Sequence, residues 1–403
     1  MKALLFTREF PPYVYGGAGV HVEYLSEELS KLMDVEVRCF GDQDINTDQL
    51  SVKGFPYENP NFRHTNDKLK AVLQTLNTSI LMNSDDIDAD VVHCHTWYAQ
   101  FAGIVAKLCY GVPLVITTHS LEPLRPWKRE QLGRGYDASS WIEKTAIEMA
   151  DAVIAVSYET KQDVLKYFNV DEDKIKVIYN GINLQEYVVT KATSTLEKYG
   201  IDPIKPYVLF VGRITRQKGI IHLVNAIKYI DPETQIVLCA GAPDTKEIGK
   251  EMEDSVNEVK KNRNNVFWIA EMLPKNEVIQ LYSHADVFCC PSIYEPFGII
   301  NIEAMACETA VVASAVGGIK EVVVNGETGI LVPLEQHHEA PFEPVNPDQF
   351  SKDLAHGINT IINDNVLKER MAKNGRKRVE EFFDWAAIAK QVKDLYKSLI
   401  SKQ

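Results

Sequence analysis

Short apolar segments rich in β-branched residues alternate along the chain with longer segments of helical periodicity, and this alternation occurs in two series. Such alternation is typical of parallel sheets with crossover helices. Several of the apolar runs are unbroken, as expected for strands buried on both faces. The sequence therefore predicts an α/β fold with two doubly wound domains. The expected strands are residues 3–7, 35–40, 91–94, 114–118, 152–156 and 176–179, then 207–211, 235–240, 266–269, 286–290, 310–313 and 330–332.

The boundary between the two predicted domains lies at a turn that is followed by a change in composition. Residues 180–183 read Asn-Gly-Ile-Asn, and a polar stretch then extends to Pro206. We therefore expect an N-terminal domain of residues 1–190 and a C-terminal domain of residues 191–383. Residues 384–403 carry apolar positions near helical spacing, so they are expected to form a helix that crosses back to the first domain.

The charge of the chain argues against a nucleic acid as its partner. Of its 403 residues, 43 are Lys or Arg and 56 are Asp or Glu, which gives a formal net charge of −13, whereas binding a phosphate backbone needs a basic face. The sequence shows neither a signal peptide nor a membrane-spanning run, so a cytoplasmic protein without membrane contact is expected. The seven cysteines include no C-x-x-C pair, which predicts buried thiols in a reducing compartment.

A glycine-rich turn follows the first expected strand. Residues 13–20 read Tyr-Val-Tyr-Gly-Gly-Ala-Gly-Val and open an amphipathic helix. Such a turn presents backbone N–H groups and the positive end of a helix to an anion, although a tight turn without a ligand has the same pattern. The spacing is not G-x-G-x-x-G and a P-loop lysine is missing, which disfavours a nicotinamide dehydrogenase and a nucleotide hydrolase.

Two further motifs follow strands of the second series. Residues 212–219 read Gly-Arg-Ile-Thr-Arg-Gln-Lys-Gly, with three cations and no acid. Cations at the carboxyl end of a strand can neutralise a diphosphate, or they can form a solvated basic loop. In the second motif Glu295 and Glu303 are eight positions apart, so two carboxylates could hold two parts of one polyol. A helix is expected to start near Gly298, with Glu295 before it and Glu303 inside it. The amides of residues 297–299 would then be donors at the start of this helix.

In this order, the Gly-Gly loop, the Gly-Arg-x-x-x-x-Lys-Gly segment and the two glutamates resemble retaining glycosyltransferases of the GT-B fold. The closer resemblance is to the actinobacterial-type glycogen synthases, also called α-maltose-1-phosphate synthases, and it covers nearly the whole chain. It implies two Rossmann-like domains that face a central cleft. It also implies a retaining glucosyltransferase of glycogen biosynthesis, with ADP-glucose or UDP-glucose as donor and glucose 1-phosphate, an α-1,4-glucan or both as acceptor.

The resemblance further implies roles for individual residues. Arg213 and Lys218 would bind the donor diphosphate and stabilise the leaving group, and Glu295 would contact hydroxyls of the transferred sugar. His119 would contact that sugar near its anomeric centre, although a histidine at such a place is by itself more readily a loop residue. The implied donor-binding residues are Gly16, Gly17, Arg213, Lys218, Met272, Glu295, Phe297, Gly298, Ile299, Ile300 and Glu303, the last on the ribose. The resemblance implies no metal and no cofactor beyond the nucleotide sugar.

A loop at residues 121–136 carries four basic and two acidic side chains together with aromatic residues. It is interpreted either as a structured surface loop or as an acceptor site, in which cations hold the phosphate of glucose 1-phosphate and aromatic rings stack on sugar. The expected acceptor residues are Arg8, Lys128, Arg129, Arg134 and Tyr136.

Some features limit what the resemblance transfers. The larger bacterial synthases have a lysine where this chain has Val14, and many have His-Asp-Trp where it has His-Thr-Trp at residues 95–97. Residues 93–95 read His-Cys-His, but alternate strand residues point to opposite faces, so no metal site is expected there. A GT-B enzyme with another small-molecule or lipid acceptor is the main alternative. A sugar-phosphate isomerase or epimerase and a non-catalytic sugar-binding protein are less consistent with the cation pair Arg213 and Lys218.

Overall fold

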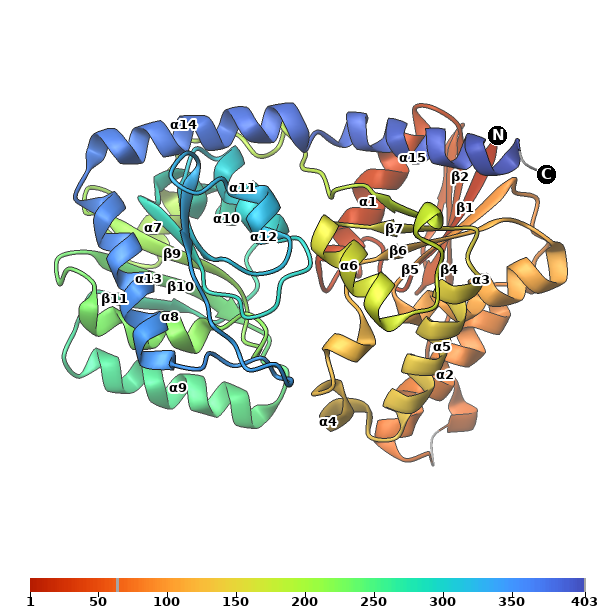
Figure 1. Ribbon diagram of the computed structural model, residues 1–403, viewed down its shortest axis with the longest axis horizontal. Helices are drawn as coiled ribbons and strands as arrows, with labels where there is room; N and C mark the ends of the chain where they lie inside the picture. Colours follow the sequence, from red (N-terminus) through yellow and green to blue (C-terminus); the bar gives the residue numbers. More distant parts are fainter. Residues whose placement is uncertain (63–64, 402–403) are drawn as a thin grey trace. The chain divides into compact units, whose positions relative to one another are not determined.

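The computed structural model describes residues 1–62 and 65–401, and the chain divides into two compact units (Figure 1). Unit 1 consists of residues 1–181 and 385–403, and unit 2 consists of residues 182–384. Residues 182–190, which we expected in the first domain, thus belong to unit 2. The Tyr187 hydroxyl donates a hydrogen bond to Glu303 at 3.0 Å, and the Tyr187 carbonyl accepts one from Arg376 at 2.7 Å.

Unit 1 is built on an eight-stranded sheet in the order β3-β4-β2-β1-β5-β6-β7-β8. All its pairs are parallel except β3 with β4. Strands β1, β5 and β6 lie side by side in the middle, so their carboxyl ends meet at one edge of the sheet. The strands are β1 (Lys2–Phe6), β2 (Asp34–Phe40), β3 (Asp44–Asn46), β4 (Leu50–Phe55), β5 (Val91–His95), β6 (Leu114–Thr118), β7 (Ala152–Ala155) and β8 (Ile175–Val177).

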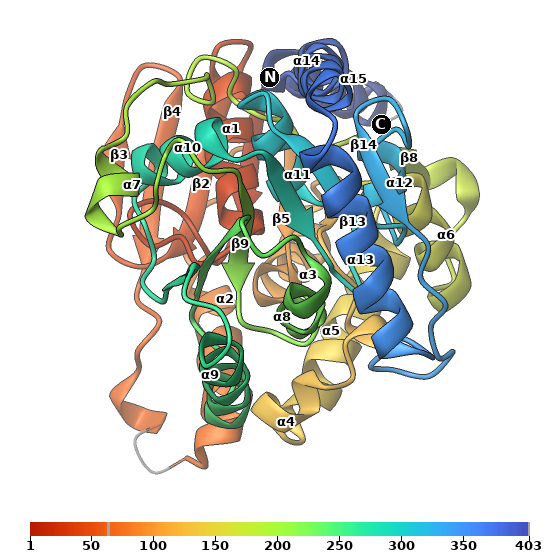
Figure 2. The same cartoon turned by 90° about the vertical axis from the view of Figure 1, so that its left-hand side faces the viewer.

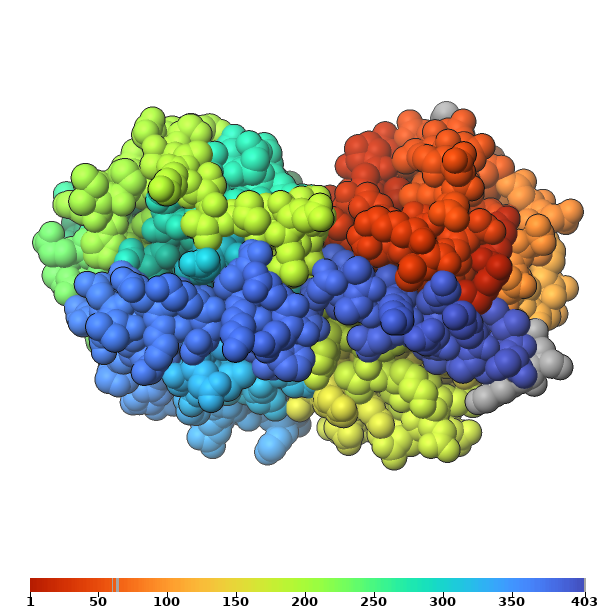
Figure 3. Space-filling model, turned by 90° about the horizontal axis from the view of Figure 1, so that it is seen from above, coloured from red at the N-terminus to blue at the C-terminus, as the bar shows by residue number. Residues whose placement is uncertain are grey.

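The helices of unit 1 cover both faces of this sheet. They are α1 (Gly17–Ser30), α2 (Asp67–Leu81), α3 (Trp97–Tyr110), α4 (Lys128–Leu132), α5 (Gly135–Met149), α6 (Tyr158–Tyr167) and α15 (Trp385–Ile400). Helix α15 shares a hydrophobic core with α1, β1 and β2, and Figure 3 shows it in dark blue along the red N-terminal part of the chain. The expected C-terminal helix therefore exists and packs on unit 1; residues 402–403 of that expectation lie outside the described residues.

Unit 2 has a six-stranded, fully parallel sheet in the order β11-β10-β9-β12-β13-β14. Helices α8, α9 and α13 share one core on this sheet, and α8 packs beside α13 (Figures 1 and 2). Helices α11 and α14 pack together on β12 and β13. The strands are β9 (Tyr207–Arg213), β10 (Gln235–Gly241), β11 (Val266–Ile269), β12 (Val287–Cys290), β13 (Ala310–Ser314) and β14 (Gly329–Val332). The helices are α7 (Ser194–Lys198), α8 (Ile220–Ala226), α9 (Lys246–Lys260), α10 (Lys275–His284), α11 (Ile299–Ala306), α12 (Ile319–Val322), α13 (Pro347–Ile362) and α14 (Asn365–Phe382).

The predicted α/β class with two doubly wound parallel sheets is confirmed, and each predicted strand overlaps an observed one. Two strands were not predicted. Strand β3 is short and exposed, and β4 is only half-buried near the sheet edge, so neither has the unbroken apolar run that marks a central strand. Among the described residues, no helix is long and apolar enough to cross a membrane.

Candidate functional site

In unit 2, the basic motif of residues 212–219 and the motif with Glu295 and Glu303 meet at one edge of the sheet. Strands β9 and β12 are neighbours, and the chain turns to opposite sides of the sheet after them, which makes this the topological switch point. Ligands of open α/β sheets bind outside the carboxyl ends of strands at such a point. The loop after β9 is tied to the loop after β12 because the Ile293 amide donates to the Gln217 carbonyl at 2.9 Å.

The centre of this arrangement is an ion pair between Lys218 and Glu295. The Lys218 Nζ lies 2.6 Å from Glu295 Oε2, and the same oxygen accepts a hydrogen bond from the Ser292 hydroxyl at 3.3 Å. Glu295 is 7% exposed, so its charge is largely shielded from water. Because a charge-assisted pair with this burial holds its geometry well, both side chains have a fixed position at the sheet edge.

Glycine residues allow the backbones around this pair to approach closely. Gly219 has φ +58°, and a Cβ there would lie 2.1 Å from the Pro291 carbonyl oxygen. Gly317, at φ +48° after β13, would place a Cβ 2.0 Å from the carbonyl oxygen of Glu295. The neighbouring Gly318 amide donates to that same carbonyl at 3.0 Å. The position of Glu295 therefore depends on backbone contacts from two other loops, which only glycine permits.

The predicted diphosphate ligand Arg213 ends β9 in the same region. Its guanidinium is about one third exposed and lies 3.1 Å from the Asp244 carboxylate, in the loop between β10 and α9. A guanidinium carries five N–H donors in all. Arg213 and Lys218 thus provide two cations at the carboxyl ends of the central strands.

Glu303 lies one turn inside α11 and is held by two tyrosines. The hydroxyls of Tyr187 and Tyr282 each donate to one of its carboxylate oxygens at 3.0 Å. Burial raises the pKa of the Glu303 carboxyl, and the two hydroxyls act in the opposite direction. Each carboxylate oxygen retains a second lone pair, so Glu303 can still accept from a vicinal diol.

The remaining donor-site residues expected in unit 2 differ in exposure. Gly298 adopts φ +98° immediately before α11, whose first amides have no partner within the helix. Phe297 is buried, whereas Ile299 and Ile300 are partly exposed at the start of α11. Met272 is 67% exposed in the loop between β11 and α10.

In unit 1, the glycine-rich turn binds an anionic group of its own chain. The amides of Tyr15 and Gly16 donate to Glu9 Oε2 at 2.9 and 2.8 Å, and α1 begins at Gly17. A turn that presents its N–H groups to one carboxylate oxygen has the donor geometry that we expected it to offer to a phosphate.

His119, directly after β6, is partly exposed and lies against a group of buried imidazoles. Its Nε2 lies 3.0 Å from His95 Nδ1, and its ring centre lies 4.6 Å from that of His21 on α1. His21 Nδ1 is 2.7 Å from Asn180 Oδ1. Burial lowers the pKa of His21 to about 4 and that of His93 to about 3, and it lowers the pKa of His95 and His119 well below the usual value. Burial therefore favours the neutral form of all four rings.

The expected acceptor cations lie on two separate segments of unit 1. The Arg8 guanidinium stacks over the Tyr98 ring at 4.1 Å. Lys128 is partly exposed and Arg134 is exposed. Arg129 lies 2.5 Å from the Asp137 carboxylate, so part of its charge is already neutralised.

Tyr136 does not provide the exposed aromatic platform that we expected. It is 8% exposed, and its hydroxyl donates to the Glu122 carbonyl inside unit 1. The Arg129 guanidinium covers the ring at 5.0 Å. A tyrosine is buried in this way when its hydroxyl finds an internal acceptor, and no local sequence pattern indicates this partner.

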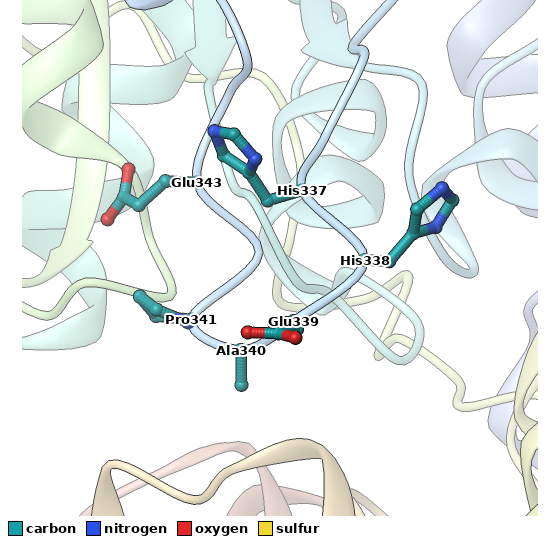
Figure 4. A pocket seen from close by; sticks show the side chains of 6 residues that line it. All are labelled: His337, His338, Glu339, Ala340, Pro341 and Glu343. Carbon is teal, nitrogen blue, oxygen red and sulfur yellow. The ribbon is translucent and has the colours of Figure 1, made fainter.

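Unit 2 also has a cavity that the site residues expected from the sequence do not line. It has a volume of about 550 Å³ and is lined by a loop between β14 and α13, where His338 points away from Glu343 (Figure 4).

Comparison with known proteins identifies the family. A profile described as Glycosyltransferase Family 4 matches residues 15–186, and one described as Glycosyl transferases group 1 matches residues 192–341. An α-maltose-1-phosphate synthase from Mycolicibacterium smegmatis is 46% identical over 403 residues, which cover 99% of this chain and 100% of the relative. This chain belongs to the α-maltose-1-phosphate synthase family of glycosyltransferases.

A second family member, the α-maltose-1-phosphate synthase from Mycobacterium tuberculosis, is 44% identical over 99% of this chain and 100% of its own length. Among solved structures, a sucrose-phosphate synthase from Thermosynechococcus elongatus superposes with a TM-score of 0.80 at 24% identity over 100% of both chains. The predicted GT-B fold and the predicted family are confirmed, and the protein is an enzyme of the hexosyltransferase type.

Sequence reasoning missed several residues that position the expected site. Tyr187, from a loop, and Tyr282, from α10, donate hydrogen bonds to Glu303. Asp244, from the loop after β10, pairs with Arg213. Only His21 left a usable signal. It lies four positions after Gly17, so helical spacing places it one turn into α1, near the strand ends at which open α/β sheets bind ligands.

Proposed function

We propose that the enzyme transfers glucose, with retention of the anomeric configuration, from ADP-glucose to glucose 1-phosphate, and that a growing α-1,4-glucan is its second acceptor. The full-length identity of 46% with an α-maltose-1-phosphate synthase carries this proposal. The product that the relative's name states, α-maltose 1-phosphate, is one glucose joined to glucose 1-phosphate. UDP-glucose is the alternative donor.

In this proposal Lys218 and Arg213 neutralise the donor diphosphate. Cleavage of the anomeric C–O bond passes through an oxocarbenium-like state and leaves negative charge on the departing phosphate. Preorganised cations stabilise that charge without reorganisation during the reaction. Lys218 suits this role because Glu295 engages its ammonium at 2.6 Å, which fixes the group while leaving it further N–H donors.

We assign Glu295 to the hydroxyls of the transferred glucose. Its described hydrogen bonds, from Lys218 and Ser292, both go to Oε2, so Oε1 can accept from a sugar hydroxyl. Glu303 would accept from the ribose diol, and the first amides of α11 would contact sugar and phosphate. Gly17 would let the backbone of the glycine-rich turn approach the diphosphate, next to the Gly16 amide that donates to Glu9.

We assign His119 to the donor sugar near its anomeric centre. Its neutral imidazole can donate one hydrogen bond and accept another, which suits a sugar that is itself both donor and acceptor. The acceptor hydroxyl would attack the anomeric carbon from the face that the phosphate leaves, and an oxygen of the departing phosphate would take its proton. Because the new bond forms on the same face as the broken one, the configuration is retained.

The proposed reaction is tested by identifying the products. The enzyme is incubated with ADP-glucose or UDP-glucose, each combined with glucose 1-phosphate or with glycogen, and products are identified by mass spectrometry. The expected result is a phosphorylated disaccharide from ADP-glucose and glucose 1-phosphate. Formation of ADP without any transfer to glucose 1-phosphate would contradict the proposed acceptor, and faster transfer from UDP-glucose would contradict the proposed donor.

The acceptor residues allow a separate test. Alanine at Lys128 or Arg134 should raise the KM for glucose 1-phosphate about 10-fold, the loss expected for one charge-assisted hydrogen bond. Alanine at Arg129 should have a smaller effect, because Asp137 already neutralises part of its charge. Turnover at saturation and the KM for ADP-glucose should not change.

The control for these variants is Lys144→Ala, which removes an exposed lysine of α5 that pairs with Glu148. It should leave every constant unchanged. An unchanged KM for glucose 1-phosphate in the Lys128, Arg129 and Arg134 variants would remove the loop from the acceptor site.

A further inference from the structure

We propose that His21, His95 and His119 of unit 1 form a binding site for a divalent transition metal such as Zn²⁺. One ring nitrogen from each of these three residues lies within 4.8 Å of the other two. The residues come from α1, from the end of β5 and from the position after β6, so the sheet edge at the topological switch of unit 1 brings them together.

The separations are close to those of a coordinated ion. A tetrahedral zinc with Zn–N distances of about 2.1 Å holds its ligand nitrogens about 3.4 Å apart. His95 Nδ1 and His119 Nε2 are already 3.0 Å apart. The ring of His21 is centred 5.3 Å from that of His95 and 4.6 Å from that of His119, so small side-chain rotations would complete the set.

Two buried nitrogens in this cluster lack a partner. His21 Nε2 and His95 Nε2 are inaccessible to solvent and make no hydrogen bond to any part of the chain that the structure describes. A buried polar atom without a partner is costly, so native proteins rarely leave one unexplained. An ion that His95 binds through Nδ1 would give His21 Nε2 its missing partner, whereas His95 Nε2 stays outside the coordination.

The hydrogen bond of His21 prepares its lone pair for a metal. Asn180 Oδ1 can only accept, so the 2.7 Å contact places the proton of His21 on Nδ1 and leaves Nε2 as a lone-pair donor. Metal-binding histidines typically donate their second N–H to a carbonyl or carboxylate in this way, which fixes the tautomer and the ring orientation. Asn180 is thus a positioning residue for the proposed site.

Neutral imidazoles are the form that binds metal. The 3.0 Å contact between His95 and His119 holds one proton, which an arriving ion must displace. The ring that carries this proton can change its tautomer and hold the proton on its other nitrogen. Metal binding then leaves the total charge of the ligands unchanged. Three histidines with a fourth position open to water or another ligand are a known arrangement for zinc.

The adjacent His93 does not belong to this set. Its Nδ1 contacts the Tyr396 hydroxyl at 2.6 Å and its Nε2 contacts Thr117 Oγ1 at 2.7 Å, so both nitrogens are in use. The proposed site therefore differs from the His-Cys-His pattern at residues 93–95, because it takes one residue of that pattern and two from other elements.

One consequence rests on the proposed function. If His119 contacts the donor sugar, a metal ion at the same imidazole competes with that contact, so Zn²⁺ should inhibit glucosyl transfer and a chelator should restore it. Metal binding itself does not depend on this consequence.

The experiment measures metal binding directly. The purified enzyme, in a Cys109→Ser background that removes the one cysteine described as exposed, is freed of metal with a chelator and titrated with Zn²⁺ against a chromophoric chelator. Co²⁺ is used in parallel, because a tetrahedral site gives it visible d–d absorption. We expect one equivalent to bind per chain.

Four variants define the site. His21→Leu and His95→Leu should each weaken Zn²⁺ binding by more than about 100-fold, and Asn180→Ala should weaken it about 10–100-fold, as loss of an outer-shell partner does. His222→Leu is the matched control, because His222 is as buried as His21, at 3%, but lies in unit 2. It should bind metal like the parent.

Circular dichroism and thermal unfolding establish that each variant is folded. If His95→Leu does not fold, His21→Leu and Asn180→Ala still decide the result. Absence of Zn²⁺ binding by the parent, or equal affinity in the parent and His21→Leu, would overturn the proposal and assign the unpartnered nitrogens to buried water.

Discussion

Replacing Lys218 by alanine is expected to lower the turnover of glucosyl transfer at least about 100-fold. The reason is the loss of a preorganised cation where the departing diphosphate develops charge, a loss that typically costs 10²–10³ in rate. The Lys218 ammonium is 2.6 Å from Glu295, and both side chains are mostly buried, so no mobile surface cation can easily replace it. Steady-state kinetics with ADP-glucose and glucose 1-phosphate provide the measurement.

Glu295→Ala should cause a loss of similar size, but the double variant should not multiply the two losses. Residues that act as one unit are strongly non-additive, since removing either member already disables the pair. A double variant whose loss equals the product of the single losses would show that Lys218 and Glu295 act independently, contrary to the geometry.

The control is a second partly buried ion pair in unit 2. Lys368, on α14, lies 2.5 Å from Asp286, with side-chain exposures of 24% and 17% against 18% and 9% for Lys218 and Glu295. Breaking a buried pair costs about 3–5 kcal/mol of stability, so Lys368→Ala should lower the thermal unfolding temperature as Lys218→Ala does. Turnover at a temperature where both are folded should fall only for Lys218→Ala. A comparable fall for both variants would attribute the effect to stability.

The sequence predicted those parts of the molecule that are marked by local patterns. Unbroken apolar runs such as that of β12 indicated the central strands, and strand ends indicated where Lys218 and Glu295 lie. Because parallel strands present their carboxyl ends at one edge, motifs far apart in sequence could be placed together in unit 2 before the structure was known.

The remainder depends on partners that no local pattern reveals. Asn180 fixes the tautomer of His21 from 159 positions away, and Tyr187 reaches Glu303 from 116 positions away. The burial of Tyr136 follows from one internal carbonyl acceptor. Such contacts arise only when loops pack, so spacing in the sequence could not predict them.

Replacing Gly219 by alanine is expected to lower turnover at least about 10-fold through the position of Lys218. An alanine Cβ at Gly219 would lie 2.1 Å from the Pro291 carbonyl oxygen, a distance that real Cβ atoms do not reach, and the obstacle is backbone. The loop after β9 must therefore move away from the loop after β12, which carries Glu295. A shift of about 1 Å in a catalytic group can cost about 100-fold in rate, so even a partial shift should be measurable.

The matched control is Gly200→Ala, which separates this clash from backbone strain. Gly200 has φ +70° against +58° for Gly219, but a Cβ there meets nothing within 4 Å. Both variants should lose the roughly 1–2 kcal/mol that a left-handed conformation costs an L-residue, which chemical denaturation measures. Only Gly219→Ala should also lose turnover, because only there does the added methyl group force apart the loops that hold Lys218 and Glu295. Equal turnover in the two variants would show that the contact between Gly219 and Pro291 does not position the catalytic pair.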